Sequence, residues 1–295
     1  MIETIFLTGG NGAFGTAFQE VCHAQDIRVV APKSGEFDIT RPDSHAHWLR
    51  DQRVGAIIHA AATTNWEHCH DKPREAFRVN TQGTLYMAQI ARELDVPFVY
   101  ISTDGVFDGL QRHHPIYESE MPGRILPGHT YGRTKLWGER VARVITPENL
   151  TVRLGWLFGP NPIIDTKFVG AILRQIARGA ETIRAVDDKW GSPTFSPDAA
   201  SKLLELVQNS AKGTRHLING DGGVTRCDVA REVCSMWAPR VSVEAVPSST
   251  FPSRVHRPEN SVLGTLFDDS RMRPWRDALG AYRDRFPDIN QFNPS

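Results

Sequence analysis

The first fifteen residues constrain the fold of this chain more than any other stretch. A short apolar run from Thr4 to Thr8 leads directly into the loop Gly9-Gly10-Asn11-Gly12-Ala13-Phe14-Gly15. Apolar residues then recur at helical spacing, at positions 14, 17, 18 and 21, which predicts a helix with one apolar face. A strand, a glycine loop and a helix in this order let the backbone approach a pyrophosphate at the helix N-terminus. The sequence therefore predicts that the first βα unit binds a dinucleotide.

The glycines of this loop fit two related templates. Gly10-x-Gly12-x-x-Gly15 is the general dinucleotide fingerprint, and Gly9-x-x-Gly12-x-x-Gly15 is a second spacing found in dinucleotide-binding enzymes. A glycine triplet by itself also occurs in flexible turns. The strand before this loop and the helix after it favour the dinucleotide interpretation.

Strand-like and helical patterns alternate through the first half of the chain. Further strands are predicted at 27–31, 55–59, 97–101 and 151–154, each followed by a helical or loop segment. Five such alternations in about 150 residues imply an α/β fold with a doubly wound parallel sheet. Beyond these residues, strands and helices no longer alternate regularly. We therefore predict a dinucleotide-binding domain over residues 1–155 and a smaller substrate-binding domain over 156–295, parts of which return to the first domain.

Helix signals are clear at several other places. One long helix is predicted from about Arg74 to Leu94, and another is expected to start near Thr40, Pro42 and Asp43. Ser196-Pro197-Asp198 has the composition of a helix start, and Thr225 with Asp228 resembles a capping box.

Charge and cysteine usage exclude some classes of partner. The 295 residues carry 34 basic and 34 acidic side chains with no basic block, which argues against nucleic acid or an anionic membrane as a partner. The four cysteines show no Cys-x-x-Cys spacing and are interpreted as reduced thiols of a cytoplasmic protein. No leader-like start and no 18-residue apolar stretch is found, so we expect a soluble chain.

The end of the second strand bears on the choice of cofactor. NAD enzymes usually place an acid there to grip the adenosine ribose, whereas this chain continues Ala31-Pro32-Lys33-Ser34. A lysine and a hydroxyl suit a 2′-phosphate better, so NADP(H) is favoured, although Lys33 could also be a solvated loop charge and NAD(H) stays open.

Tyr131 and Lys135 form a candidate catalytic pair, in which the Tyr131 phenol would be the acid. Residues four apart on a helix share one face, so the ammonium can act on the phenol and favour its ionised form. The spacing also occurs in ordinary surface pairs. Thr103, at the end of the strand over 97–101, is placed where a hydroxyl could hold a substrate carbonyl, because ligands of open α/β sheets lie beyond the carboxyl ends of the strands.

A loop over residues 63–71 contains side chains that could bind a metal, including His68, Cys69, His70 and Asp71. No second cluster of suitable spacing completes a tetrahedral set, so no metal is predicted and a substrate-facing or solvated loop is favoured.

Taken together, these motifs resemble the extended short-chain dehydrogenases/reductases, and most closely the dTDP-4-dehydrorhamnose reductases. The resemblance covers nearly the whole length and rests on the following stretches: Gly9 to Gly15, Ala60-Ala61-Ala62, Val79-Asn80, Ser102-Thr103-Asp104, Val106-Phe107-Asp108-Gly109, Tyr131-Gly132-Arg133-Thr134-Lys135-Leu136-x-Gly138-Glu139, Arg153-x-x-Trp156, Asp188-x-x-Gly191-Ser192-Pro193-Thr194 and Arg257-Pro258-x-Asn260-Ser261.

The resemblance implies a Rossmann fold and a reductase of a nucleotide-activated 4-keto-6-deoxysugar. Thr103, Tyr131 and Lys135 would be the catalytic triad. Tyr131 would protonate the oxygen of the C4 ketone as hydride arrives, and Thr103 would hydrogen-bond that oxygen. Lys135 would hold the nicotinamide ribose and lower the pKa of Tyr131.

Cofactor and substrate contacts follow from the same resemblance. Residues expected at the cofactor are Gly9, Gly12, Ala13, Phe14, Gly15, Lys33, Ser34, Asp38, Ile39, Ala60, Ala61, Ala62, Asn80, Tyr131 and Lys135. Asn80 could instead bind a neighbouring backbone. Residues expected at the substrate are Trp66, Glu67, Thr103, Asp104, Gly105, Trp156 and Arg257. Trp156 would line the sugar pocket and Arg257 would meet the diphosphate, for which a planar charged fork is suited.

The chain departs from the family pattern near the sugar. Gly105 stands where Ser-Thr-Asp-Tyr-Val-Phe has its tyrosine, and Trp66-Glu67 stands where Val-Asp is usual. Some members bind a divalent ion through a glutamate after the Pro-Thr pair, but Pro197 occupies that position here, beside Asp198. These changes bear on which sugar is the substrate more than on which reaction is catalysed.

Two other functions remain open. A sugar-nucleotide epimerase would use the same fold, whereas a dehydratase would need a glutamate where Gly105 stands. A cofactor-binding regulatory subunit, like the beta subunit of methionine adenosyltransferase, would need the glycine loop but no working acid. The apolar helix faces could equally serve a core or a homodimer.

Overall fold

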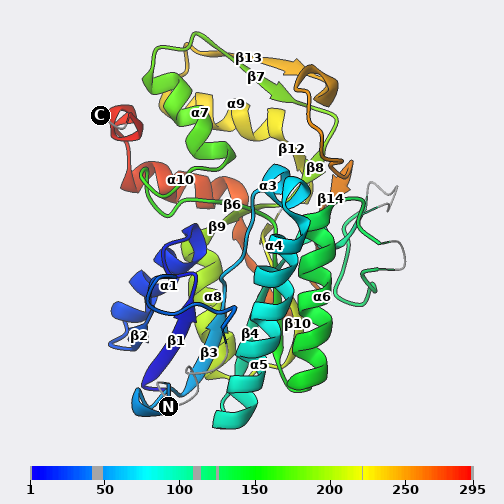
Figure 1. The fold of residues 1–295 in the computed structure, drawn as a ribbon. Helices are drawn as coiled ribbons and strands as arrows, with labels where there is room; N and C mark the ends of the chain where they lie inside the picture. Colours follow the sequence, from blue (N-terminus) through cyan, green and yellow to red (C-terminus); the bar gives the residue numbers. More distant parts are fainter. Residues whose placement is uncertain (1, 42–48, 109–113, 124–125, 221, 294–295) are drawn as a thin grey trace.

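A six-stranded parallel sheet forms the centre of the protein. The computed structural model describes residues 2–41, 49–108, 114–123, 126–220 and 222–293, and Figure 1 shows their arrangement. The strands, in spatial order, are β10 (Gly213–Leu217), β5 (Leu150–Leu154), β4 (Phe98–Thr103), β3 (Ala56–His59), β1 (Thr4–Thr8) and β2 (Arg28–Val30). Every neighbouring pair is parallel. This confirms the predicted fold class, a doubly wound parallel sheet.

Helices cover both faces of the sheet. The α-helices of the described residues are α1 (Ala13–His23), α3 (Trp66–Asp71), α4 (Pro73–Phe77), α5 (Gly83–Leu94), α6 (Thr130–Ile145), α7 (Phe168–Ala177), α8 (Ser196–Gln208), α9 (Arg226–Trp237) and α10 (Trp275–Arg285). In the sheet layer, α1 packs against α8 on one face, and α5 packs against α6 on the other.

The alternation of side chains along β1 explains this layering. Ile5 and Leu7 are buried in the core that α1 and α8 cover, whereas Phe6, between them, is buried with Met87 and the other apolar residues of α5. Because successive side chains of a strand point to opposite faces, one apolar run serves both cores.

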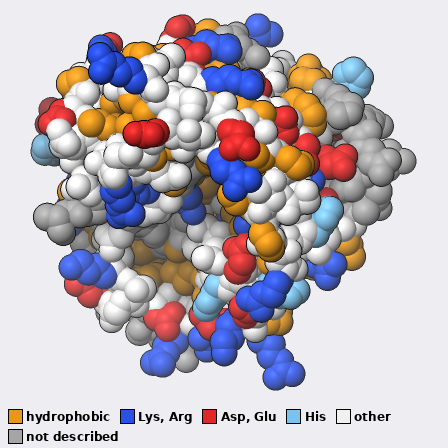
Figure 2. Space-filling view, turned by 90° about the horizontal axis from the view of Figure 1, so that it is seen from above, with side chains coloured by type: hydrophobic (Ala, Val, Ile, Leu, Met, Phe, Trp, Pro, Cys, Tyr) orange, Lys and Arg blue, Asp and Glu red, His pale blue; other side chains and the backbone are white. Residues whose placement is uncertain are grey.

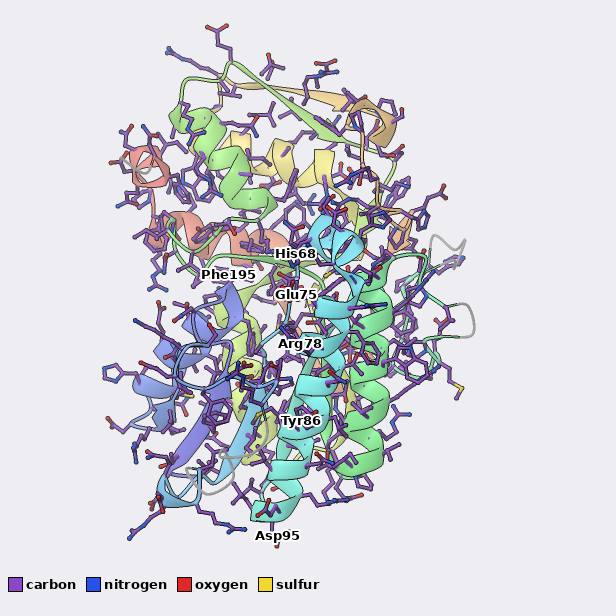
Figure 3. All side chains as sticks on the ribbon, in the orientation of Figure 1. His68, Glu75, Arg78, Tyr86, Asp95 and Phe195 are labelled. Carbon is purple, nitrogen blue, oxygen red and sulfur yellow. The ribbon has the colours of Figure 1, made fainter. Side chains whose placement is uncertain are left out.

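The predicted helix from Arg74 to Leu94 is not one regular helix. It consists of α4, a π-helical turn called η1 (Arg78–Gln82) and α5. Figure 3 shows Glu75, Arg78 and Tyr86 following one another along this helical segment. A π-turn inserts an extra residue and is often found at functional sites. The helical periodicity of the sequence did not reveal it.

A second lobe lies above the sheet in Figure 1 and has its own apolar core. Its main elements are α7, α9, α10 and the parallel pair β7 (Thr182–Val186) and β13 (Ser242–Val246). Short strands connect the lobes: β6 (Trp156–Phe158), β8 (Trp190–Gly191), β9 (Pro193–Phe195), β11 (Asn219–Gly220), β12 (Val224–Thr225), β14 (Asn260–Ser261) and β15 (Met272–Pro274). Two later elements, α8 and β10, pack with the first 155 residues. A division at residue 155 stays a prediction.

Some local predictions can be compared directly. Ser196-Pro197-Asp198 opens α8, and Thr225 with Asp228 forms a complete capping box at α9. The helix expected to start at Thr40 falls largely on residues 42–48, outside the described part of the chain. Among the helices of the described ranges, none combines the length and apolar character needed to cross a bilayer.

Gly138 provides a test of how tightly α6 packs on β4. An added Cβ would meet the Tyr100 hydroxyl and would lie 2.9 Å from the backbone oxygen of Asn80. We expect Gly138→Ala to lower the free energy of unfolding by about 2 kcal/mol, because overpacking forces the helix away. Urea unfolding measures the change.

Gly280 is the matched control for this substitution. It also lies inside a helix, α10, but an added Cβ there meets nothing within 4 Å. Gly280→Ala is expected to raise the free energy of unfolding by about 0.5–1 kcal/mol through the lower backbone entropy of the unfolded chain. Equal effects of the two substitutions would contradict the packing argument.

Candidate active site

The glycine loop after β1 is shaped by two close approaches. Gly9 has a positive φ of 76°, and a Cβ on it would lie 2.7 Å from the backbone nitrogen of Ala61. A Cβ on Gly15 would lie 2.7 Å from Gly10 Cα. The loop therefore packs closely on the residues after β3, and the N-terminus of α1 stays accessible to a ligand.

A cavity of about 1010 Å³ lies between the sheet and the second lobe. It is lined by the residues that follow β1, β3, β4 and β5, and by residues of the second lobe such as Phe168 and Arg226. Seen from above, the molecule is hollowed near its centre, and basic and acidic side chains alternate around it (Figure 2). Of the residues predicted to bind cofactor or substrate, all but Asn80 line this cavity.

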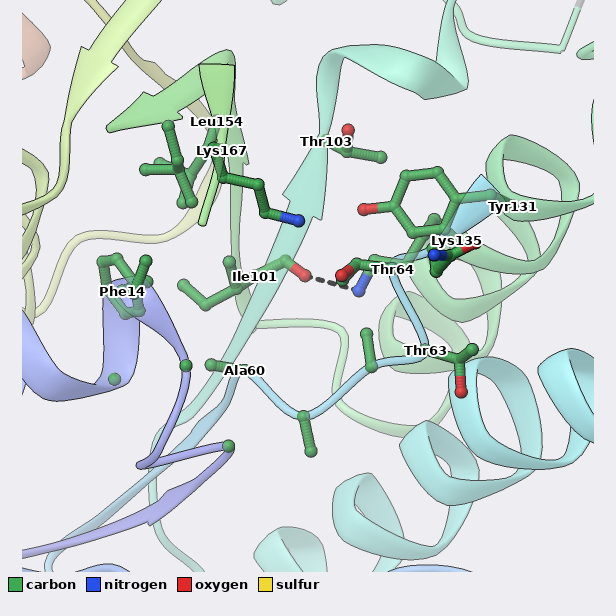
Figure 4. Close-up of a pocket in the computed structure, with 18 of the residues that line it drawn as sticks. Phe14, Ala60, Thr63, Thr64, Ile101, Thr103, Tyr131, Lys135, Leu154 and Lys167 are labelled. Carbon is green, nitrogen blue, oxygen red and sulfur yellow. Dashed lines mark hydrogen bonds between the residues drawn. The ribbon is translucent and has the colours of Figure 1, made fainter. Parts of the chain in front are cut away.

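Thr103, Tyr131 and Lys135 come together at the end of β4 (Figure 4). The Tyr131 ring reaches from the first turn of α6 toward Thr103, and both residues line the cavity. Lys135 lies one turn later and donates from Nζ to the Ile101 backbone oxygen at 2.7 Å. The structure thus brings Thr103 of β4 together with Tyr131 and Lys135 of α6, and the catalytic roles of the three residues stay predictions.

The charges of these groups differ from the expectation. Burial raises the pKa of Tyr131 above its ordinary value, the nearby Thr103 hydroxyl opposes this shift, and the neighbouring Asp104 adds to it. Burial also lowers the pKa of Lys135 to about 7, while the Glu139 charge opposes this shift. The expected lowering of the Tyr131 pKa by Lys135 is therefore wrong for this structure. The ammonium points to the Ile101 oxygen, and at pH 7 the phenol holds its proton.

A buried polar network supports α6 from behind. Arg153 of β5 donates to both carboxylate oxygens of Glu139, at 2.9 and 2.8 Å, and Ser102 donates to the same carboxylate at 2.6 Å. Burial alone would raise the pKa of Glu139, but the Arg153 charge and these hydrogen bonds lower it. The network connects the last residues of β4 and β5 to the helix that carries Tyr131 and Lys135.

Asn80 is the one predicted cofactor residue that does not line the cavity, and it binds a neighbouring backbone, the other role left open for it. It is fully buried in the π-turn η1 and does not line the cavity. Its Oδ1 accepts from the Thr63 backbone nitrogen at 2.8 Å, and its Nδ2 donates to the Thr63 oxygen at 3.0 Å and to Thr134 Oγ1 at 2.9 Å. Its amide is fully used in holding the loop after β3 against α6, so it positions the wall of the cavity.

The predicted substrate residues Glu67 and Arg257 form an ion pair with each other at 2.7 Å. Arg257 also lies over the Trp66 ring, with its guanidinium carbon 5.0 Å from the ring centroid. Ser253 donates a hydrogen bond to Glu67 as well. These contacts join α3 to the chain segment around residue 257 at the edge of the cavity.

His129 is a part of the site that sequence reasoning missed. Its Nδ1 accepts from the Gly132 backbone nitrogen at 3.0 Å and caps α6, and its ring stacks on Trp66 at 3.9 Å between centroids. Burial lowers its pKa to about 4, so the ring is neutral at pH 7. A Cβ on Gly105 would lie 3.3 Å from this ring. Two of the departures from the family pattern, Gly105 and Trp66, therefore lie beside His129.

Three further cations line the cavity and were not predicted from the sequence: Lys167, Lys189 and Arg226. Lys167 precedes α7 and extends its ammonium into the cavity (Figure 4). Arg226 begins α9 and lies over the Trp156 ring, 4.3 Å from its centroid. The spacing of these residues carries no motif, so only the tertiary structure brings them together. Within the described part of the chain, no group of three His, Cys, Asp or Glu side chains is placed to hold a metal ion.

The parallel sheet, the glycine loop and the helix bearing Tyr131 and Lys135 define an extended short-chain dehydrogenase/reductase with a Rossmann fold. A family model described as the RmlD substrate binding domain matches residues 3–287. The chain belongs to this family of dTDP-4-dehydrorhamnose reductases.

Individual relatives agree with this assignment. The chain is 31% identical to a dTDP-4-dehydrorhamnose reductase of Mycolicibacterium smegmatis, over 95% of this chain and 84% of the relative. It is 30% identical to a dTDP-4-keto-6-deoxy-D-glucose reductase of Streptomyces niveus, over 98% and 99%. The crystal structure of a dTDP-4-dehydrorhamnose reductase from Bacillus anthracis in complex with NADP matches 97% of this chain and 100% of that chain, with a TM-score of 0.86 and 26% identity.

The contact between Gly105 and His129 can be tested by a double-mutant cycle. Gly105→Ala is expected to lower the free energy of unfolding by about 1–3 kcal/mol, because its Cβ presses on a ring that is already stacked on Trp66. His129→Asn keeps an oxygen that can cap α6 but removes the ring. Urea unfolding of the single and double variants should give a coupling energy of about 0.5–3 kcal/mol. Additive losses would contradict the contact.

Proposed function

We propose that this protein reduces the 4-keto group of a nucleotide-activated 4-keto-6-deoxysugar, a dTDP-sugar by preference, with NADPH as the hydride source. The observation that carries the proposal is the meeting of Thr103, Tyr131 and Lys135 at one point of a cavity that also contains the glycine loop. The family membership and the names of the relatives support it.

Tyr131 is the proposed proton donor. Reduction of a ketone creates an alkoxide, which needs a proton and hydrogen-bond donors at its oxygen. Burial keeps Tyr131 protonated at pH 7, and its hydroxyl faces the cavity beside Thr103. We infer that Thr103 holds the same oxygen. In this structure Thr103 donates its single proton to Asp104 at 2.9 Å and accepts from the Gly105 nitrogen at 3.1 Å, so the proton would turn from Asp104 to the substrate oxygen on binding.

The residues of the cavity fit a dinucleotide. Because Gly9 and Gly15 have no Cβ, the loop folds tightly against its own backbone and that of Ala61, and a pyrophosphate can approach the N-terminus of α1. When bound, the nicotinamide would supply the hydride. We infer that Lys135, deeper in the cavity, holds the nicotinamide ribose, and that Lys33 and Ser34 hold the adenosine 2′-phosphate.

The charge of the cavity supports an anionic substrate. The whole chain has no net charge. The cavity wall nevertheless contains six basic side chains, namely Lys33, Lys135, Lys167, Lys189, Arg226 and Arg257. Its acidic side chains are three, namely Asp38, Glu67 and Asp104. A cavity with this excess of positive charge favours ligands with several phosphates, as a dinucleotide and a nucleotide-sugar together would provide.

Removal of the Tyr131 hydroxyl tests the proton donor. Tyr131→Phe is expected to lower kcat by about 10²–10⁴-fold with a dTDP-4-keto-6-deoxyhexose, because the alkoxide loses its acid. The dissociation constant of NADPH should stay nearly unchanged. Tyr86→Phe, the same change at a residue of α5 that does not line the cavity, is the control. Turnover by Tyr131→Phe at the wild-type rate would refute the assignment.

The cofactor preference is tested at Lys33. Lys33→Ala is expected to raise the KM for NADPH about tenfold or more, since a charge-assisted hydrogen bond to the 2′-phosphate is lost, and to leave the KM for NADH unchanged. Lys212→Ala removes an exposed lysine that does not line the cavity and serves as control. Equal use of NADPH and NADH by the wild type would overturn the assignment.

A panel of dTDP-, UDP- and GDP-linked keto-sugars, followed by NADPH absorbance, tests the reaction as a whole. Conversion of a sugar nucleotide without net NADPH consumption would favour an epimerase. Binding of NADPH without any turnover, together with copurification of a synthetase, would favour a regulatory subunit. The homodimer stays a prediction from the apolar helix faces.

A further inference from the structure

We propose that Arg226 binds the diphosphate of the nucleotide-sugar substrate together with Arg257. This inference rests on the proposed function and assigns a second guanidinium to the substrate half of the cavity. The sequence motifs do not include Arg226, because only the fold brings the start of α9 to the cavity.

Aromatic rings hold Arg226 in a defined orientation. Its guanidinium carbon lies 4.3 Å from the centroid of Trp156 and 4.8 Å from that of Phe168. The Trp156 ring is in turn placed against Gly191, where an added Cβ would meet the indole. Stacking uses the face of a guanidinium and leaves the N–H groups at its edge free for a ligand.

Arg226 differs from Arg257 in its partners. Arg257 is joined to Glu67 at 2.7 Å. Across the described residues, no carboxylate lies within ion-pair distance of Arg226, and the nearby Asp104 is engaged with Thr103. Burial lowers the pKa of Arg226 to about 10, and the positive charge of Arg257 lowers it further. Both guanidiniums line the same cavity, and each positive charge disfavours the other.

A dianion between them fits this arrangement better than other ligands. A diphosphate carries enough charge for two arginines and offers oxygens for a bidentate fork at each. The cofactor pyrophosphate is expected at the glycine loop after β1, whereas Arg226 belongs to the second lobe and contacts Trp156, a residue expected at the sugar. A carboxylate on the sugar would need only one arginine.

Binding of nucleotides that differ only in phosphate number tests the assignment. The enzyme is saturated with NADPH and titrated calorimetrically with whichever of dTDP, UDP and GDP the wild type binds most tightly. The corresponding monophosphate and nucleoside are titrated alongside. Four proteins are compared, namely the wild type, Arg226→Gln, Arg226→Lys and Arg231→Gln. Arg231 lies on the same helix, is exposed and does not line the cavity, so its variant controls for the loss of one charge.

Arg226→Gln is expected to weaken binding of the diphosphate by about ten- to hundredfold, as for loss of a hydrogen bond to a charged group. Nucleoside binding should change less than about twofold. Arg226→Lys should recover part of the affinity, because it restores the charge without the planar fork. In steady-state assays, KM for the keto-sugar should rise while kcat changes little, since ground state and transition state lose the contact equally.

Several results would overturn the inference. Unchanged affinity for the diphosphate would do so, and so would equal weakening for diphosphate and nucleoside, which would mean that Arg226 only supports Trp156. A raised KM for the keto-sugar with unchanged diphosphate binding would place Arg226 at the sugar instead. Failure of the proposed function is a separate result: the wild type would bind the diphosphate but reduce no keto-sugar, and the comparison of nucleotides would still decide the role of Arg226.

Discussion

The candidate site depends on one buried ion pair, between Arg153 of β5 and Glu139 of α6. Both side chains are at most 3% exposed, and the two bonds of the fork fix the distance between strand and helix. Removing one partner of such a pair leaves a buried charge and costs about 3–5 kcal/mol in other proteins. Because Lys135 lies one turn before Glu139, the same pair sets where Lys135 and Tyr131 meet Thr103 at the end of β4.

Burial has opposite consequences at the two ends of the cavity. Near β4 it keeps Tyr131 protonated and makes the charge of Lys135 easier to lose, so this part is suited to handling a proton. Toward the second lobe, aromatic rings shield Arg226 but leave its charge, because a guanidinium with a pKa of about 10 stays protonated at pH 7. The cavity therefore combines a neutral donor, Tyr131 of the sheet lobe, with cations that include Arg226 of the second lobe.

The fold and the centre of the site could be predicted because their signals are local. A glycine loop between a strand and a helix, a run of alternating elements, and a tyrosine four residues before a lysine are all readable in short windows. The π-turn at Asn80 could not be read in this way, since it is a single inserted turn within a continuous helical segment. Neither could the stack of Trp66 on His129, because those residues are distant in sequence and meet only when α3 packs beside α6.

The sequence by itself determined the parallel sheet, the glycine loop and the face of α6 that carries Tyr131 and Lys135, because each depends on the spacing of nearby residues. Only the tertiary structure determined the charge states of Tyr131 and Lys135 and the set of residues that line the cavity. The pKa of Tyr131 depends on how much water burial removes from around its hydroxyl. The substrate half of the cavity depends on Arg226 of α9, which reaches a cavity formed at the edge of the sheet. Such contacts arise from long-range packing, which residue spacing does not encode.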